Sequence, residues 1–212
     1  MTPEDAFLAD IVSQPDDNVP RLIYADWLQD QADPVRAARG EFIRAQIECE
    51  RLQTQGDTSD TWARLAARSQ ELLARHQRQW LGKPCSPRLR WVFRRGFLVG
   101  MGDETLWEQD TPGYRYLARF YDDGVVVSDS ATAPMNELWD SFHRRTEHHG
   151  RGPYTFWWTP RAVLVKFHAV SSSGQVDYEG TIVGRTMRLK WYSHINNAKG
   201  EEVYKARLRD GS

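Results

Sequence analysis

The spacing of the apolar residues changes once along this chain of 212 residues, close to Trp80. Before that residue, apolar side chains recur every three or four positions, as Phe42, Ile43 and Ile47 do, and this is the period of one helix face. From residue 114 onward they alternate with polar residues, which is the period of a half-buried strand. The change predicts an α+β chain in which helices come first and strands follow.

The helical part carries clear start signals. Thr2 supplies a hydroxyl N-cap, Pro3 suits the first helical position, and Glu4 places a carboxylate at the positive end of the helix dipole. We expect helices at about residues 2–13, 18–31, 34–53 and 59–80. Because the loops between them are short, we expect an antiparallel helical bundle over residues 1–80.

The second part reads as an antiparallel β-meander with one inserted helix. After a connecting segment at 81–113, which holds a short strand or hairpin, tight turns such as Asp122-Asp123-Gly124 separate short alternating runs. We expect strands at residues 114–121, 125–128, 154–158, 162–170, 175–183, 186–192 and 202–208, and a helix at 134–146. A meander of this kind over residues 114–212 tends to curl into a barrel.

Residues 20–47 read PRLIYADWLQDQADPVRAARGEFIRAQI. This stretch resembles the bacterial repeat-companion domain, whose signature joins "PRL.YADWL" to "RGEFIR.Q". The resemblance covers residues 1–53 and implies an N-terminal helical domain that accompanies repeat arrays without established catalysis. A "W.F.RGF" segment is also present at 91–97, but no leucine-rich repeat follows it, so functions tied to such repeats do not carry over.

Five residues of the signature are candidates for binding a protein partner: Tyr24, Asp26, Trp27, Arg39 and Glu41. A structural interpretation stands beside this one. Asp26 then pairs with Arg39, while Tyr24 and Trp27 share a helix face that packs against Phe42. The two interpretations are compatible.

The runs RFYDDGVVV, GPYTFWW and VDYEGTIVGRTMRLKWYSHIN are similar to those of small lipocalin-like bacterial modules. This resemblance implies a barrel that either holds a small apolar ligand or fills its interior with its own side chains. The ligand-pocket candidates are Tyr116, Phe120, Trp139, Phe142, His168 and Trp191.

The sequence contains only weak patterns for a metal site or a catalytic site. The histidines and glutamate at 143, 147, 148 and 149 lack the spacing of a zinc protease and read as a solvated helix end, so we expect no metal site and no cofactor. Asp177 and Glu179 share one strand face, and we interpret them as a solvent-facing row opposite Arg188 or Lys190. A hydrolase that uses His168 or His194 at the barrel mouth remains as an alternative function.

The charge and hydropathy of the chain limit the classes of partner that we expect. Residues 56–100 hold three acids and nine bases, but the net charge is only −1 and no nucleic-acid motif is present. We therefore expect the charged blocks to neutralise one another rather than to bind nucleic acid. No apolar run is long enough for a membrane span, the acidic N-terminus is unlike a signal peptide, and Cys49 and Cys85 are typical of reduced thiols. We expect a cytoplasmic, non-enzymatic interaction or adaptor protein whose β-domain binds a protein partner or a small apolar ligand.

Overall fold

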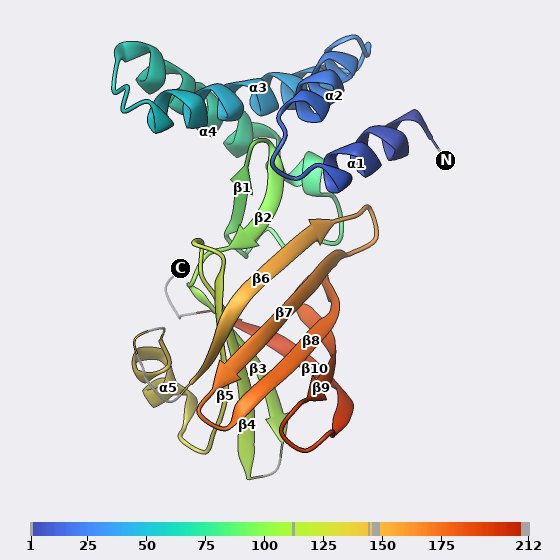
Figure 1. Cartoon of the computed structure of the whole chain (residues 1–212). Coiled ribbons are helices and arrows are strands. Elements are labelled where there is room, and N and C mark those ends of the chain that lie inside the picture. Colours follow the sequence, from blue (N-terminus) through green and yellow to red (C-terminus); the bar gives the residue numbers. More distant parts are fainter. Residues whose placement is uncertain (1, 112, 144, 146–148, 209–212) are drawn as a thin grey trace. The chain divides into compact units, whose positions relative to one another are not determined.

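The computed structural model describes residues 2–111, 113–143, 145 and 149–208, and the chain divides into two compact units (Figure 1). Residues 1–81 and 93–97 form the first, which we call the helical unit. Residues 82–92 and 98–212 form the second, the barrel unit. The predicted α+β class is confirmed: helices precede an antiparallel barrel that carries one short inserted helix.

The helical unit contains α1 (Pro3–Ser13), α2 (Val19–Gln29), α3 (Pro34–Thr54) and α4 (Asp60–Leu81). The predicted start of α1 is present as a capping box. The Thr2 hydroxyl accepts a hydrogen bond from the Asp5 N–H at 3.2 Å, and the Asp5 carboxylate accepts one from the Thr2 N–H at 2.7 Å. At α3, the Asp33 carboxylate caps the helix in front of Pro34.

The core of the helical unit consists of two apolar clusters on opposite sides of α3. Tyr24 packs with Ile43 and Phe97 in one cluster, and Trp27 packs against its edge. Phe42 belongs to the other cluster, which it shares with Leu72 and Trp80. The prediction that Tyr24 and Trp27 pack against Phe42 is therefore wrong. Neighbouring helical residues differ by about 100° in direction, so Ile43 meets α2 while Phe42 meets α4.

Eight antiparallel strands close the barrel in the order β10-β3-β4-β5-β6-β7-β8-β9. They are β3 (Thr105–Thr111), β4 (Tyr114–Phe120), β5 (Val125–Ala131), β6 (Gly150–Trp158), β7 (Val163–Ser171), β8 (Gly174–Val183), β9 (Thr186–Ser193) and β10 (Lys199–Leu208). β3 comes from the segment predicted as a connecting piece, and it pairs with both β4 and β10. Closure removes exposed sheet edges.

Two smaller elements complete the fold. β1 (Trp91–Arg94) and β2 (Phe97–Met101) form a hairpin, and its turn residues Arg95 and Gly96 both have positive φ, as a tight two-residue turn requires. α5 (Met135–Ser141) lies beside the barrel wall in Figure 1. It ends earlier than the predicted helix at 134–146, whose residues 144 and 146 lie outside the described part of the chain.

Candidate functional site

The inner face of the barrel has a filled half and an accessible half. In the filled half, the ring of Phe120 lies 5.0 Å from that of Tyr154, 5.1 Å from Phe156 and 5.6 Å from Phe167. None of these four residues is more than 7% exposed. Edge-to-face contacts of this kind fill space densely, so this half is a structural core.

The accessible half holds five inward-facing residues that are only half-buried, and we call them the mouth cluster: Gln109, Tyr116, Tyr178, Trp191 and Glu202. The strand register places them on the inner face. Gln109 is opposite Tyr116, Tyr178 is opposite both Phe167 and Trp191, and Glu202 is opposite the buried Leu189. Residues opposite one another in a ladder point to the same side of the sheet.

The charge of Glu202 acts on the hydroxyls of three tyrosines that face the interior of the barrel. A hydrogen bond with Tyr114 raises the pKa of Tyr116 to about 12, and burial and the charge of Glu202 add to the effect. Burial raises the pKa of Tyr178 and of Tyr204, and in both cases the charge of Glu202 raises it further. The mouth cluster is therefore a region of negative potential.

Two acceptor groups of the mouth cluster have no donor. The side-chain oxygen Oε1 of Gln109 is buried without a hydrogen-bond partner. The Glu202 carboxylate makes no hydrogen bond and no ion pair with any described residue. On the inward positions of the described strands there is no Lys, Arg or His. A buried acceptor is normally satisfied, so Gln109 Oε1 has capacity for a donor from outside the chain, whereas the half-buried Glu202 carboxylate still reaches solvent.

The structure brings some of the predicted ligand-pocket residues together and not others. Tyr116, Phe120 and Trp191 face the interior, with Phe120 in the filled half. Trp139 and Phe142 instead pack on the outer wall against Leu106, Leu117 and Val127. His168 lies on the outer face of β7, opposite Asp177. β4 is buried on both faces, so its pattern alone does not tell which face α5 covers.

Sequence reasoning missed Gln109, Tyr178 and Glu202. The signal for Glu202 was present, because strict alternation over residues 202–208 places it on the same face as Tyr204 and Ala206. Gln109 lies in β3, which was not predicted as a strand.

The predicted alternative site holds a His–Asp pair on the outer face. His194 Nε2 lies 2.7 Å from Asp177 Oδ2, and the Gln175 amide donates to the other carboxylate oxygen at 2.7 Å. The hydrogen bonds from His194 and then Gln175 lower the pKa of Asp177. A hydrolase also needs a nucleophile beside the histidine, and no hydroxyl or thiol of a described residue hydrogen-bonds the ring of His194 or His168.

A groove with a volume of about 650 Å³ runs over the same outer face. Its apolar lining includes Leu164, which is 44% exposed, and Val203, which is 40% exposed. Beside them runs a row of alternating charges across four strands, formed by Lys166, Glu179, Lys190 and Glu201. Glu179 lies opposite Lys190 on the neighbouring strand, in agreement with the solvent-facing row predicted from the sequence. Asp177 lies opposite Tyr192 instead of a basic residue.

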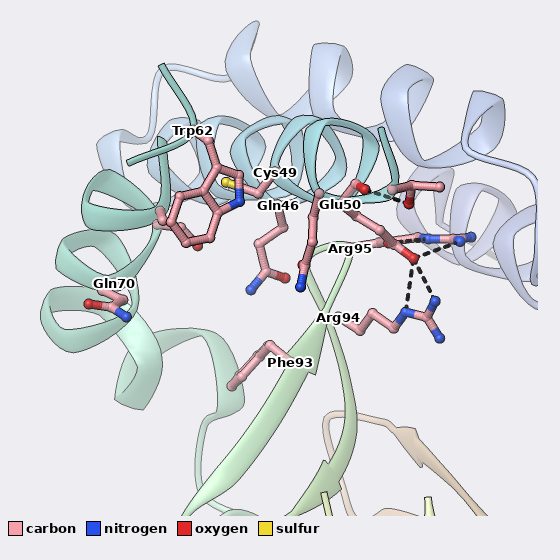
Figure 2. Close-up of a pocket in the computed structure, with 12 residues that line it drawn as sticks. Gln46, Cys49, Glu50, Trp62, Gln70, Phe93, Arg94 and Arg95 are labelled. Carbon is pink, nitrogen blue, oxygen red and sulfur yellow. Dashed lines mark hydrogen bonds and ion pairs between the residues drawn. The ribbon is translucent and has the colours of Figure 1, made fainter. Parts of the chain in front are cut away.

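The helical unit has a separate groove of about 530 Å³ between α3, α4 and the turn of the β1–β2 hairpin (Figure 2). Figure 2 shows Trp62, Gln46 and Phe93 around it. The indole nitrogen Nε1 of Trp62 is buried without a hydrogen-bond partner, and Gln46 Oε1 accepts a hydrogen bond from the Gly96 N–H at 2.7 Å. Burial raises the pKa of the Cys49 thiol in this groove, which keeps the sulfur protonated and a poor nucleophile.

Glu50 binds the hairpin turn to α3 at one end of this groove. Its carboxylate accepts hydrogen bonds from Arg95 Nε at 2.6 Å and from Arg94 Nε at 3.1 Å. The hydrogen bond from Arg95, with that from Arg94, lowers the pKa of Glu50 to about 2. The arrangement fixes the hairpin turn within the helical unit.

The partner-binding candidates of the signature all contact other residues of the helical unit. Tyr24 is fully buried and donates a hydrogen bond to Glu4 Oε1 at 2.7 Å. Asp26 forms an ion pair with Arg44, and Glu41 accepts a hydrogen bond from Arg68 at 2.6 Å. The remaining two residues are involved in cation–π contacts: Arg36 lies over the ring of Trp27 and Arg39 over that of Phe97. Tyr24 is thus a core residue, while Asp26 presents an exposed carboxylate.

The remaining sequence features concern the histidine cluster, metal binding and membrane spans. His149 lies 2.7 Å from the Asp129 carboxylate, while residues 147 and 148 of the histidine cluster lie outside the described chain. Within the described ranges, no group of three or more His, Cys, Asp or Glu side chains could hold a metal ion. Nor is any helix there long and apolar enough to cross a membrane.

No protein family model, no curated protein and no solved structure matches this chain. The repeat-companion and lipocalin-like resemblances therefore rest on the residue patterns alone and stay predictions.

Proposed function

We propose that this chain is a non-enzymatic binding protein whose barrel holds a small, largely apolar ligand at the mouth cluster. The observation that carries the proposal is the difference in burial along the inner face. An antiparallel barrel of eight strands is just wide enough to be filled by side chains or to hold one small ligand. Here Phe120 and its neighbours fill one half, whereas the rings of Tyr116, Tyr178 and Trp191 stay partly accessible in the other.

A titration with the uncharged, environment-sensitive dye N-phenyl-1-naphthylamine tests this proposal on the full chain. Saturable fluorescence enhancement is expected at one site. Trp191→Ala should weaken the binding about tenfold, because it removes an aromatic wall of the site. Tyr192→Ala is the matched control, since the neighbouring side chain points to the outer face and is 39% exposed.

Circular dichroism establishes that both variants are folded before the titration. Equal dye binding by the two variants would place the site outside the barrel, and the absence of saturable binding to the wild type would contradict the proposal.

Binding of a protein partner is a second candidate, favoured by the exposed apolar side chains of the outer groove. Leu164 and Val203 line it beside the row of alternating charges. A segment of another protein that docks there would bury both side chains. Leu164→Glu should then abolish co-purification of a partner with the native protein while the dye affinity stays unchanged, and co-purification that survives the substitution would exclude this groove.

A further inference from the structure

The mouth cluster surrounds a carboxylate that the chain itself does not neutralise. Glu202 faces inward from β10, and its charge raises the pKa of Tyr116, Tyr178 and Tyr204, which face the same interior. By contrast, the carboxylate of the preceding residue, Glu201, faces outward and lies 3.5 Å from the ammonium nitrogen of Lys190. Two adjacent glutamates thus have opposite environments, and only the outward one has a cation beside it.

The polar atoms of the mouth cluster that lack a hydrogen-bond partner among the described residues are acceptors. Gln109 Oε1 and the Glu202 carboxylate can only accept hydrogen bonds, and none of the described inward positions offers a basic side chain. A single sign of charge between low-dielectric walls focuses the field and concentrates ions of the opposite sign. The site is therefore complementary to a group that is positively charged.

Aromatic faces enclose the same space. Tyr178 stacks on Phe167 at 4.5 Å, which holds its ring against the filled half. The indole of Trp191 lies across Gly200, where a Cβ atom would come within 2.9 Å of it. The glycine thus lets the indole lie on β10, the strand that carries Glu202 two residues further on. Aromatic rings around a cation are the means by which proteins recognise quaternary ammonium groups, and a carboxylate beside the rings adds the opposite charge.

We propose that the ligand of the barrel is an organic ammonium cation, whose charged nitrogen lies beside Glu202 and whose apolar body contacts Tyr116, Tyr178 and Trp191. This rests on the proposed function and specifies the chemistry of its ligand. An inorganic divalent ion fits the site less well, because calcium and magnesium require six or more oxygen ligands and the described inner face offers one carboxylate.

The test measures benzyltrimethylammonium binding to the full chain by calorimetry and by displacement of N-phenyl-1-naphthylamine. Its uncharged isostere, neopentylbenzene, is measured in the same displacement assay. The cation should bind about tenfold more tightly than the isostere. Glu202→Gln should remove that advantage, so that the cation and the isostere bind to the variant with similar affinity.

Glu201→Gln is the matched control, because it removes the same charge from the neighbouring, outward position. Its affinity for the cation should equal that of the wild type. Circular dichroism confirms the fold of both variants.

The outcomes separate this inference from the proposed function. Dye binding that depends on Trp191, together with cation binding that is absent or equal in the wild type and Glu202→Gln, would overturn the inference and leave the proposed function standing. An equal loss in Glu201→Gln and Glu202→Gln would also overturn it, since it would reveal a response to net charge alone. If the dye does not bind, the proposed function fails, and the inference that rests on it fails with it.

Discussion

The two halves of the barrel interior share strands but differ in the residues that these strands contribute. On β4, Phe120 belongs to the filled half and Tyr116 to the accessible half; on β9, Met187 and Trp191 divide in the same way. Four residues along a strand separate a fully buried apolar side chain from a half-buried aromatic one. A closed barrel can therefore concentrate its stability at one end and leave the other end free for recognition, because strands such as β4 and β9 contribute to both.

The largest expected effect is in the filled half. Phe120→Ala removes the ring at the centre of the aromatic contacts and should lower the free energy of unfolding by about 3–5 kcal/mol. Leu164→Ala on the exposed outer face is the control, with an expected change within about 0.5 kcal/mol. Denaturant unfolding measures both. Equal changes in the two variants would show that Phe120 is not at a packed core.

A smaller effect is expected from a single hydrogen bond in the same half. The buried hydroxyl of Tyr154 donates to the backbone carbonyl oxygen of Tyr121 at 2.7 Å. Tyr154→Phe keeps the ring and removes this one hydrogen bond, while the Gly124 N–H still donates to the same carbonyl at 3.1 Å, so unfolding should become easier by about 0.5–1.5 kcal/mol. Unchanged denaturation midpoints at pH 7 would show that water replaces the hydroxyl, and the filled half would then be less closed than described.

The same tyrosine predicts how stability changes at alkaline pH. Burial raises the pKa of Tyr154 from 10.0 to about 12. Since the folded state holds the proton more tightly than the unfolded chain, this contribution is fully present below pH 10 and is lost as the pH rises towards 12. The loss of stability between pH 9 and pH 11 should thus be smaller in Tyr154→Phe than in the wild type. Parallel pH curves for the two proteins would contradict the burial of this hydroxyl.

The smallest effect is expected at the mouth cluster. Glu202 has no described partner to lose, so Glu202→Gln should change the free energy of unfolding by no more than about 0.5 kcal/mol in the absence of ligand. Chemical denaturation of the wild type and the variant at pH 7 measures it. A loss comparable with that of Phe120→Ala would mean that Glu202 is part of the structural core, and the two halves of the barrel would no longer differ.

Local signals in the sequence predict much of this fold. The Thr2 N-cap, Pro34 at the start of α3 and the Asp122–Gly124 turn each act within a few residues, and each is present where it was expected. Contacts between distant segments were harder to predict. The pairing of β3 with β10 joins residues about a hundred positions apart in the sequence. The contacts of α5 with the outer wall join residues that are tens of positions apart. No local pattern specifies contacts of this kind.

The candidate site shows the same limit. Alternation within one strand is enough to place Tyr116 on the same face as Phe120. It could not bring Gln109, Tyr178 and Glu202 to the same opening, since that requires the order of the strands.

The most direct measurement compares two tryptophans on the inner face by their indole N–H signals in a ¹⁵N–¹H NMR titration. Trp191 lies in the mouth cluster, whereas Trp107 is fully buried with its indole N–H donating to the sulfur of Met101 at 3.2 Å. Trp191→Phe and Trp107→Phe assign the two signals. On addition of benzyltrimethylammonium, the Trp191 signal should shift in a saturable manner while the Trp107 signal stays in place. A stationary Trp191 signal, or shifts of equal size at both positions, would contradict a barrel that is filled at one end and binds its ligand at the other.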